Sequence, residues 1–231
     1  MRLDKLLSHM GYGSRKNVKA LIRQGYVSVN GEVVANDDYK VDEKTDEIIL
    51  FDEAVCYEDE IYLLMNKPQG VLTATRDSSQ PTVLDLIDGY DRRNLFPVGR
   101  LDKDTTGLLL ITNNGKLAHQ LLSPKNHVDK TYELTFSGTL CPNYATLFAE
   151  GVRLEDDFVC LPATISVEQN RAVITIQEGK YHQIKRMMEA VGGTVLTLKR
   201  ISFGPLNLPM DLKEGDYRLL TKEEIAALKE C

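Results

Sequence analysis

Residues 99–111 read Gly99-Arg100-Leu101-Asp102-Lys103-Asp104-Thr105-Thr106-Gly107-Leu108-Leu109-Leu110-Ile111, a dense polar cluster joined directly to an apolar run. The two glycines and two threonines predict a constrained loop at the edge of a sheet, followed by a buried strand. Arg100 and Lys103 flank Asp102, and nearby positive charge favours an ionised carboxylate. A surface turn held by local salt bridges would explain the same residue types, and the residue types alone favour that plainer interpretation.

Apolar patterning around this loop predicts alternating groups of strands and helices. We expect strands at residues 61–65, 107–112, 131–137, 163–167, 172–177 and 194–198. We expect helices at residues 116–122, 143–150, 182–191 and 222–229. Adjacent strands with helices between the groups indicate an α+β fold with a mixed, mostly antiparallel sheet flanked by helices.

Charge divides the N-terminal part of the chain into two segments. Residues 1–31 carry a charge of +5 and residues 32–60 a charge of −10, although the whole chain carries only −6. This asymmetry indicates a basic contact module beside an acidic, solvated stretch. The cations of the basic segment are Arg2, Lys5, Arg15, Lys16, Lys19 and Arg23.

The basic segment also predicts a helix and a hairpin. Ser14 is a favourable N-cap for a helix from about residue 15 to residue 24, and Asn30-Gly31 is a typical hairpin turn. Arg15, Lys19 and Arg23 recur every four residues and share one face, with no acidic residue four positions away. Such cations repel one another unless an anion lies near, and a phosphate backbone is the natural partner.

Three stretches of this segment resemble the S4 RNA-binding domain: R-L-D-K-L-L from Arg2, S-R-K-x-V-K-x-L-I-x-x-G from Ser14 and V-S-V-N-G from Val27. The resemblance covers about the first 50 residues and implies that the six cations contact RNA. We place the domain boundary in the acidic residues 52–60. The S4-like domain then spans residues 1–58 and a second domain spans residues 59–231.

The segment G-R-L-D-x-x-T-x-G-L-L-L-x-T-x-x-G, from Gly99 to Gly115, resembles the central motif of the RsuA/RluA group of pseudouridine synthases. Residues 65–70 (M-N-K-P-Q-G), 130–132 (K-T-Y) and 178–187 (E-G-K-Y-H-Q-I-K-R-M) resemble its other motifs in the expected order. The resemblance implies breakage of a C–N glycosidic bond, rotation of the uracil and joining of its C5 to the ribose. Nothing is oxidised, so no redox cofactor is needed, and we expect no cofactor. The cysteines and histidines show no ligand spacing, so we expect no metal.

The resemblance assigns roles to four residues. Asp102 is the essential aspartate, either as the nucleophile or as the acceptor of a ribose proton. Tyr132 stacks on the target base. Lys185 forms the ion pair that orients Asp102. Many relatives have arginine at this position, and arginine can donate two parallel hydrogen bonds to a carboxylate, which lysine cannot. Arg100 holds the loop or enters the RNA helix as the target base leaves it, and its alternative role is a surface salt bridge to Asp104.

The last motif also bears on the RNA target. Tyr181-His182-Gln183-Ile184-Lys185-Arg186-Met187 resembles the RsuA type, which modifies one uridine in the 16S RNA of the small ribosomal subunit. Large-subunit relatives more often carry Asn-Arg-Gln-x-Arg. The resemblance therefore implies 16S ribosomal RNA, or a small-subunit assembly intermediate, as the partner. His182 and Gln183 either line the pocket or serve in capping and packing.

Three alternatives stay open. The same reaction could act on 23S ribosomal RNA. A non-catalytic S4-type ribosome assembly factor would leave about 170 residues without a role. A glycoside hydrolase could use Asp102 and Asp104 as a carboxylate pair, but sugar clefts are usually rich in tryptophan and this chain has none.

The sequence also indicates the compartment. The first residues are charged, without the apolar run of a signal peptide, and no stretch approaches the roughly 18 apolar residues of a membrane helix. The cysteines form no C-x-x-C pair and the histidines show no ligand spacing. We expect a monomeric cytoplasmic protein with reduced thiols at Cys56, Cys141, Cys160 and Cys231.

Overall fold

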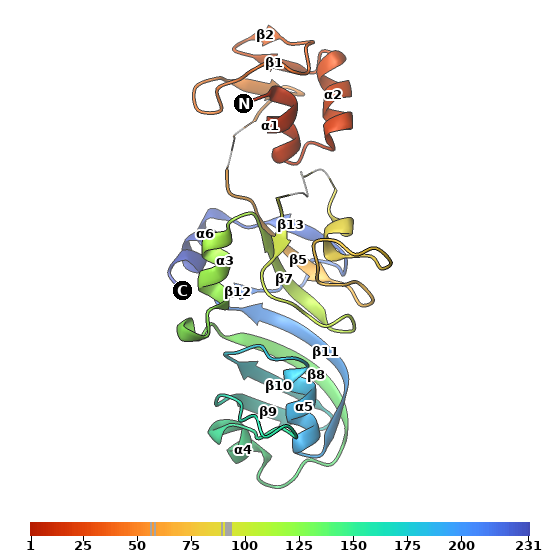
Figure 1. The fold of residues 1–231 in the computed structure, drawn as a ribbon, viewed down its shortest axis with the longest axis vertical. Helices are drawn as coiled ribbons and strands as arrows, with labels where there is room; N and C mark the ends of the chain where they lie inside the picture. Colours follow the sequence, from red (N-terminus) through yellow and green to blue (C-terminus); the bar gives the residue numbers. More distant parts are fainter. Residues whose placement is uncertain (56, 58, 89, 91–93) are drawn as a thin grey trace. The chain divides into compact units, whose positions relative to one another are not determined.

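The computed structural model describes residues 1–55, 57, 59–88, 90 and 94–231, which form two compact units (Figure 1). The first unit comprises Met1–Ile61 with Leu84–Phe96, and the second comprises Tyr62–Val83 with Pro97–Cys231. The charge pattern does not predict that Leu84–Phe96 belongs with the N-terminal residues. In the described part of the chain, no helix has both the length and the apolar character needed to cross a membrane.

The first unit contains two helices and a small sheet. The helices are α1 (Leu3–His9) and α2 (Arg15–Arg23). Within the described residues the sheet has four antiparallel strands in the order β2-β1-β3-β4. Their bounds are β1 (Val27–Val29), β2 (Glu32–Val33), β3 (Ile48–Leu50) and β4 (Glu53–Ala54). The helices bury Leu3, Leu6, Leu7, Val18 and Ile22 against the apolar side chains of β1 and β3.

The structure confirms the predicted start of α2 and the predicted hairpin. The side-chain oxygen of Ser14 accepts a hydrogen bond from the Asn17 N–H at 3.3 Å. Asn30 and Gly31 have φ angles of 53° and 82°, as the tight turn between β1 and β2 requires. The Asn30 side chain also accepts a hydrogen bond from the Glu47 N–H at 2.9 Å, which fastens the acidic segment beside this turn. β3 has no clear signal in the sequence because acidic residues surround its three apolar positions.

The second unit is built on a mixed sheet, which confirms the predicted α+β class. Nine strands lie within the described residues, seven of them in the order β13-β5-β7-β11-β8-β10-β9, while β12 pairs with β11 and β6 with β7. Neighbours along this order are antiparallel except β7 and β11, which are parallel. The bounds are β5 (Tyr62–Lys67), β6 (Phe96–Pro97), β7 (Thr106–Thr112), β8 (Lys130–Gly138), β9 (Thr164–Glu168), β10 (Arg171–Ile176), β11 (Gly193–Phe203), β12 (Leu206–Asn207) and β13 (Tyr217–Leu219).

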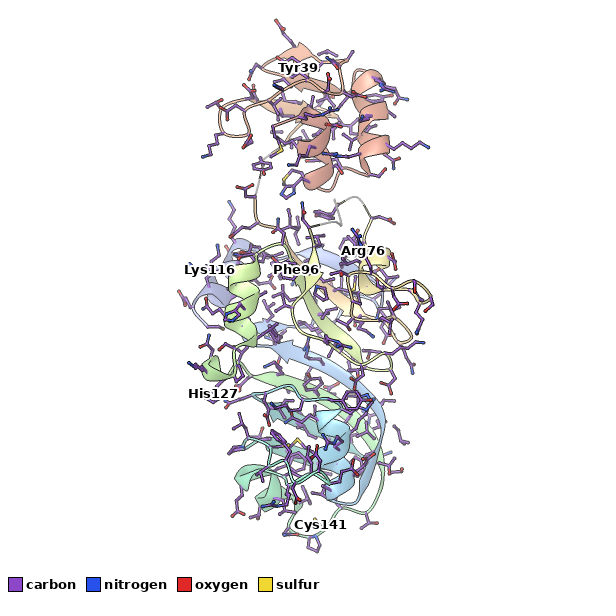
Figure 2. The ribbon with its side chains drawn as sticks, in the orientation of Figure 1. Tyr39, Arg76, Phe96, Lys116, His127 and Cys141 are labelled. Atoms are coloured by element: carbon purple, nitrogen blue, oxygen red, sulfur yellow. The ribbon has the colours of Figure 1, made fainter. Side chains whose placement is uncertain are left out.

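The predicted helices of this unit are confirmed to within one residue at each end. They are α3 (Gly115–Leu122), α4 (Tyr144–Glu150), α5 (Gln183–Ala190) and α6 (Lys222–Lys229). Two short 3-10 helices of the described residues are not predicted by the sequence pattern. η2 (Pro124–Asn126) belongs to the second unit, whereas η1 (Val83–Leu86) begins at the last residue of that unit's first segment and continues into the first unit. Figure 2 draws the side chains, and His127, labelled there, follows η2 at a left-handed φ of 48°. Cys141, Cys160 and Cys231 are free thiols, and Cys56 lies outside the described residues.

The parallel pairing of β7 with β11 joins the two halves of this sheet through only two residue pairs, Thr106 with Lys199 and Gly107 with Arg200. Beyond this point Arg200 continues the link, because its buried Nε donates a hydrogen bond to the Leu108 carbonyl at 2.7 Å. Gly107 has a φ of +101°, and a Cβ atom there would lie 2.2 Å from the Arg200 carbonyl oxygen. The junction therefore requires glycine at this position.

Gly107→Ala is expected to destabilise the protein by about 2–4 kcal/mol, because a side chain strains the backbone and pushes β7 and β11 apart. The urea unfolding midpoint of the second unit measures this loss. Gly115→Ala is the matched control, since a Cβ at the start of α3 meets nothing within 4 Å. Equal midpoints for the two variants would contradict the close approach at Gly107.

Candidate active site

The loop that carries Asp102 lies between β6 and β7 and is held by the end of β5. Lys67 is fully buried, and its Nζ donates hydrogen bonds to the carbonyls of Pro68 at 3.0 Å, Lys103 at 3.3 Å and Thr105 at 3.0 Å. Burial lowers the pKa of Lys67 to about 8, although the charges of Asp104 and Asp102 act in the opposite direction. Lys67 thus joins both flanks of the loop to the sheet.

A second contact fixes the residue before Asp102. The Thr73 hydroxyl donates to the Leu101 carbonyl at 2.8 Å and accepts from the Leu101 N–H at 3.2 Å. The Gly70 N–H also donates to the Lys103 carbonyl at 2.8 Å. Because the backbone is bonded on both sides, the Asp102 side chain projects from a rigid turn. The sequence pattern did not predict that Lys67 and Thr73 hold this loop. The available signal was the lysine that ends the otherwise apolar run of β5.

The structure brings Lys185 of α5 to the two acidic residues of the loop. Lys185 Nζ lies 3.4 Å from Asp102 Oδ2 and donates to both oxygens of Asp104, at 2.7 Å and 2.8 Å. The predicted partner Asp102 is therefore close, but the shorter hydrogen bonds go to Asp104. A lysine can shift between two carboxylates in this way because its ammonium is a compact charge with three donors.

The charges of this cluster support one another. The hydrogen bond from Lys185 lowers the pKa of Asp104 below its ordinary value, against the opposing effect of partial burial. Burial alone would lower the pKa of Lys185, but Asp104 and Asp102 outweigh it and raise that pKa. Lys185 therefore stays protonated beside Asp102.

A cavity of about 380 Å³ opens over Asp102. It is lined by Gln69, Gly70, Asp102, Lys103, Asp104, His182 and Lys185. This volume lies within the range of ordinary small-molecule sites. A larger hollow of about 580 Å³ lies against β8–β11 and reaches Gln69 and Asp104.

Strand register connects Tyr132 of β8, across β11, to the start of β7 just after the Asp102 loop. Tyr132 of β8 pairs with Arg200 of β11, and Arg200 pairs with Gly107 of β7, five residues after Asp102. Paired residues present their side chains on one face of a sheet. Tyr132 is 7 % exposed and is not among the described residues that line the Asp102 cavity. The ring therefore lies in the same row of the sheet without reaching that cavity.

Arg100 does not hold the loop through its side chain, as the resemblance implied that it could. Arg100 is exposed, and its guanidinium has no hydrogen-bond or ion-pair partner among the residues that the structure describes. Among the residues that the structure describes, no ion pair joins Arg100 to Asp104, whose two carboxylate oxygens accept hydrogen bonds from Lys185 instead. Lys67 and Thr73 hold the loop instead, and Arg100 is left facing solvent.

His182 and Gln183 have different surroundings. His182 lines the cavity, with Nε2 at 3.8 Å from Asp102 Oδ1. Gln183 is buried and accepts a hydrogen bond from the Lys180 N–H at 2.9 Å while donating to Glu178 at 2.9 Å. Gln183 therefore braces the start of α5, whereas His182 faces Asp102.

Three of the six cations of the first unit, Arg2, Lys19 and Arg23, have acidic partners among the described residues. Arg23 lies 2.6 Å from Asp37, and Lys19 lies 3.8 Å from both Asp37 and Asp4. The Arg2 guanidinium donates a hydrogen bond to Asp4 at 2.9 Å. Burial raises the pKa of Asp4, but the hydrogen bond from Arg2 and the nearby positive charges outweigh burial and lower that pKa. Asp37, 14 residues after Arg23, is an anion that relieves the repulsion between Lys19 and Arg23, and helical spacing does not reveal it. Lys5 and Lys16 are exposed and Arg15 is half-buried.

Comparison with known proteins covers both units. The RNA pseudouridylate synthase family model matches residues 61–190, and the S4 domain model matches residues 1–48. An uncharacterised RNA pseudouridine synthase of Bacillus subtilis is 48% identical over 236 residues, covering 100% of this chain and 99% of the relative. A ribosomal small subunit pseudouridine synthase A is 41% identical in Yersinia pestis (99% and 98% covered) and 39% identical in Escherichia coli (99% and 100% covered).

A solved structure agrees with these relatives. The crystal structure of a pseudouridylate synthase superposes with a TM-score of 0.70 at 37% identity, covering 99% of both chains. Both the fold and the sequence are therefore similar over nearly the full length. The chain belongs to the RNA pseudouridylate synthase family and carries an S4 domain at its N-terminus.

Proposed function

We propose that this protein converts a uridine in the 16S RNA of the small ribosomal subunit to pseudouridine, with Asp102 as the catalytic carboxylate. The observation that carries the proposal is that Asp102, Lys185 and His182 line one cavity and lie close together. Asp102 lies on a loop that hydrogen bonds from Lys67 and Thr73 hold in place. Relatives named ribosomal small subunit pseudouridine synthase A, similar over nearly the whole length of both chains, support the choice of RNA.

The reaction exchanges one bond at the ribose for another. The C1′–N1 bond breaks, the uracil turns within the cavity, and a C5–C1′ bond forms. The C5 proton then leaves to water and N1 takes up a proton from water, so that the product is an isomer of uridine. Asp102 either attacks C1′ or accepts a ribose proton, and both routes require an ionised carboxylate. Lys185 keeps a positive charge beside this carboxylate. Because the shorter hydrogen bonds of Lys185 go to Asp104, an oxygen of Asp102 stays accessible to the ribose.

The remaining residues serve binding and base extrusion. In this proposal the target uridine leaves its stack and enters the cavity, which costs a few kcal/mol. Tyr132 stacks on the uracil after the ring or the base shifts, and the exposed Arg100 enters the gap left in the RNA. The S4-like domain, residues 1–58, holds phosphates, and the catalytic domain, residues 59–231, acts on the base in the cytoplasm.

The test is tritium release from transcripts labelled at uridine C5, because formation of the new bond expels that label. We expect release from 16S RNA or a partly assembled small subunit, and none from 23S RNA. Release from 23S RNA alone would reassign the substrate and keep the reaction. No release from any of the three would contradict the catalytic proposal and favour an RNA-binding assembly factor.

The ion pairs of α2 give a prediction for RNA binding. Asp37→Asn should strengthen RNA affinity, since it frees Lys19 and Arg23 from a carboxylate that competes with phosphate. Lys19→Ala with Arg23→Ala should weaken affinity and reduce the slope of log K against log salt by up to about 1.4, at about 0.7 per phosphate contact on single strands. Filter binding across a salt series measures both. Identical slopes for the parent protein and all variants would remove α2 from the RNA interface.

A further inference from the structure

Tyr181 is the most exposed aromatic side chain among the residues that the structure describes, with 77% of its surface accessible. Its ring lies parallel to the His182 ring, with the centroids 3.9 Å apart and the planes 16° apart. One face of Tyr181 is therefore covered by an imidazole that lines the Asp102 cavity, and the other face is open. The open face of the ring is therefore free to stack on another flat group.

The backbone under this ring pair is strained. His182 has a φ of 49°, a left-handed conformation that a non-glycine residue seldom adopts, at the position where α5 begins. This conformation directs Nε2 towards Asp102 Oδ1, at 3.8 Å. Strain of this kind is retained at functional sites when neighbouring contacts enforce it.

The neighbouring contacts are the hydrogen bonds of Gln183, which accepts from the Lys180 N–H and donates to Glu178, each at 2.9 Å. They close the turn around Tyr181 and His182 from both sides. The two rings thus have a defined position, so a ligand that stacks on Tyr181 meets a prearranged surface.

We propose that the open face of Tyr181 is a stacking platform for the base next to the target uridine in the RNA. The proposal rests on the proposed function, because extrusion of the uridine removes a stacking neighbour from the flanking base. An aromatic ring at the edge of the cavity replaces that neighbour and continues the stack onto His182. A nucleobase fits this site because every base has a flat π face, and the exposed Lys103 and Lys180 supply positive charge for the phosphates. In this role Tyr181 determines which RNA neighbourhood of the uridine is bound and does not take part in the bond exchange.

The experiment measures RNA affinity and turnover separately. Tyr181→Ala should raise the KM and the Kd for the RNA about 5- to 150-fold, the equivalent of one lost base stack, while kcat changes little. Tyr181→Phe should rescue most of this loss, because the open ring face remains. Met210→Ala is the control, since Met210 is fully exposed and lies outside the site.

A second measurement identifies the stacked base. The Kd of the parent protein and of Tyr181→Ala is measured for RNA fragments that have an abasic site 5′ or 3′ of the target uridine. At one of the two positions, loss of the base should cancel the effect of the variant. The chain contains no tryptophan, so Tyr181→Trp introduces a single indole whose fluorescence should be quenched by intact RNA and not by that abasic RNA.

These outcomes separate the inference from the proposed function. If the parent protein releases tritium but neither abasic position couples to Tyr181, the platform is overturned and the function stands. If no RNA is converted, the function is contradicted, and the platform that rests on it is overturned as well. A Tyr181→Ala variant that lowers kcat alone would make Tyr181 a shield for His182 and overturn the inference.

Discussion

Asp102→Asn is expected to lower the rate of pseudouridine formation by about 10³- to 10⁴-fold or more, because the amide neither attacks C1′ nor accepts a ribose proton. The substitution is nearly isosteric, so the cavity keeps its shape. RNA affinity should stay within about twofold of the parent value, since the phosphate contacts proposed for the first unit are unchanged. Single-turnover tritium release, with saturating protein and labelled RNA, measures the chemical step without product release.

Asp157→Asn is the matched control for this variant. It makes the same change of carboxylate to amide on an exposed loop of the same unit, where the Asp157 side chain is 90% accessible. The control should retain parental turnover, and both variants should unfold at the parental urea midpoint. An Asp102→Asn protein that keeps more than about a tenth of the parental rate would show that another group performs the chemistry.

Lys185→Met is expected to lower kcat by about 10²- to 10³-fold with a smaller change in KM, because it removes the cation that faces Asp102. Methionine keeps the length and the apolar part of the side chain, so the packing of α5 is largely preserved. Lys185→Arg should recover much of the activity, since a guanidinium can bond both carboxylates. A loss confined to KM would instead identify Lys185 as a phosphate contact.

A pH series gives Lys185→Met a second readout that concerns stability. The hydrogen bond from Lys185 lowers the pKa of Asp104 from the ordinary value of 3.8, so the pair stabilises the fold above that pH. This contribution is lost as the pH falls through the lowered pKa of the folded state. The difference in urea midpoint between the parent protein and Lys185→Met should therefore be largest near neutral pH and shrink in acid. A difference that stays constant into acid would contradict the ion pair with Asp104.

The sequence by itself determined the elements that depend on local patterns. The N-cap at Ser14 and the Asn30-Gly31 turn follow from side chains that act on their own backbone, and both are confirmed. Five of the six strands predicted in the second unit lie within two residues of their predicted bounds. β8 and most of β10 alternate apolar and polar residues, and β5 and β7 contain continuous apolar runs, and both patterns are strong signals. The predicted β11 is too short, since register shifts near Thr197 and Ser202 interrupt the alternation.

Only the tertiary structure decided how distant residues meet. Arg23 and Asp37, Lys67 and Thr105, and Lys185 and Asp104 are separated by 14, 38 and 81 residues. Such contacts leave no periodic trace in the chain, because they depend on which strands pair and where each strand ends. The parallel junction of β7 with β11 sets Tyr132, Arg200 and Gly107 in one row, and no local pattern specifies that pairing.

The same distinction explains the outcome at the candidate active site. The motif around Asp102 and the motif around Lys185 are recognisable in the sequence, so the resemblance could pair them. A few ångströms of loop geometry decide three further features. These are the hydrogen-bond partner of Lys185, the exposure of Arg100 and the hydrogen bonds from Lys67 to the loop. Local sequence determined which residues and elements were available, and long-range strand pairing decided their neighbours, because hydrogen bonds and ion pairs form only between groups that the fold brings within about 3–4 Å.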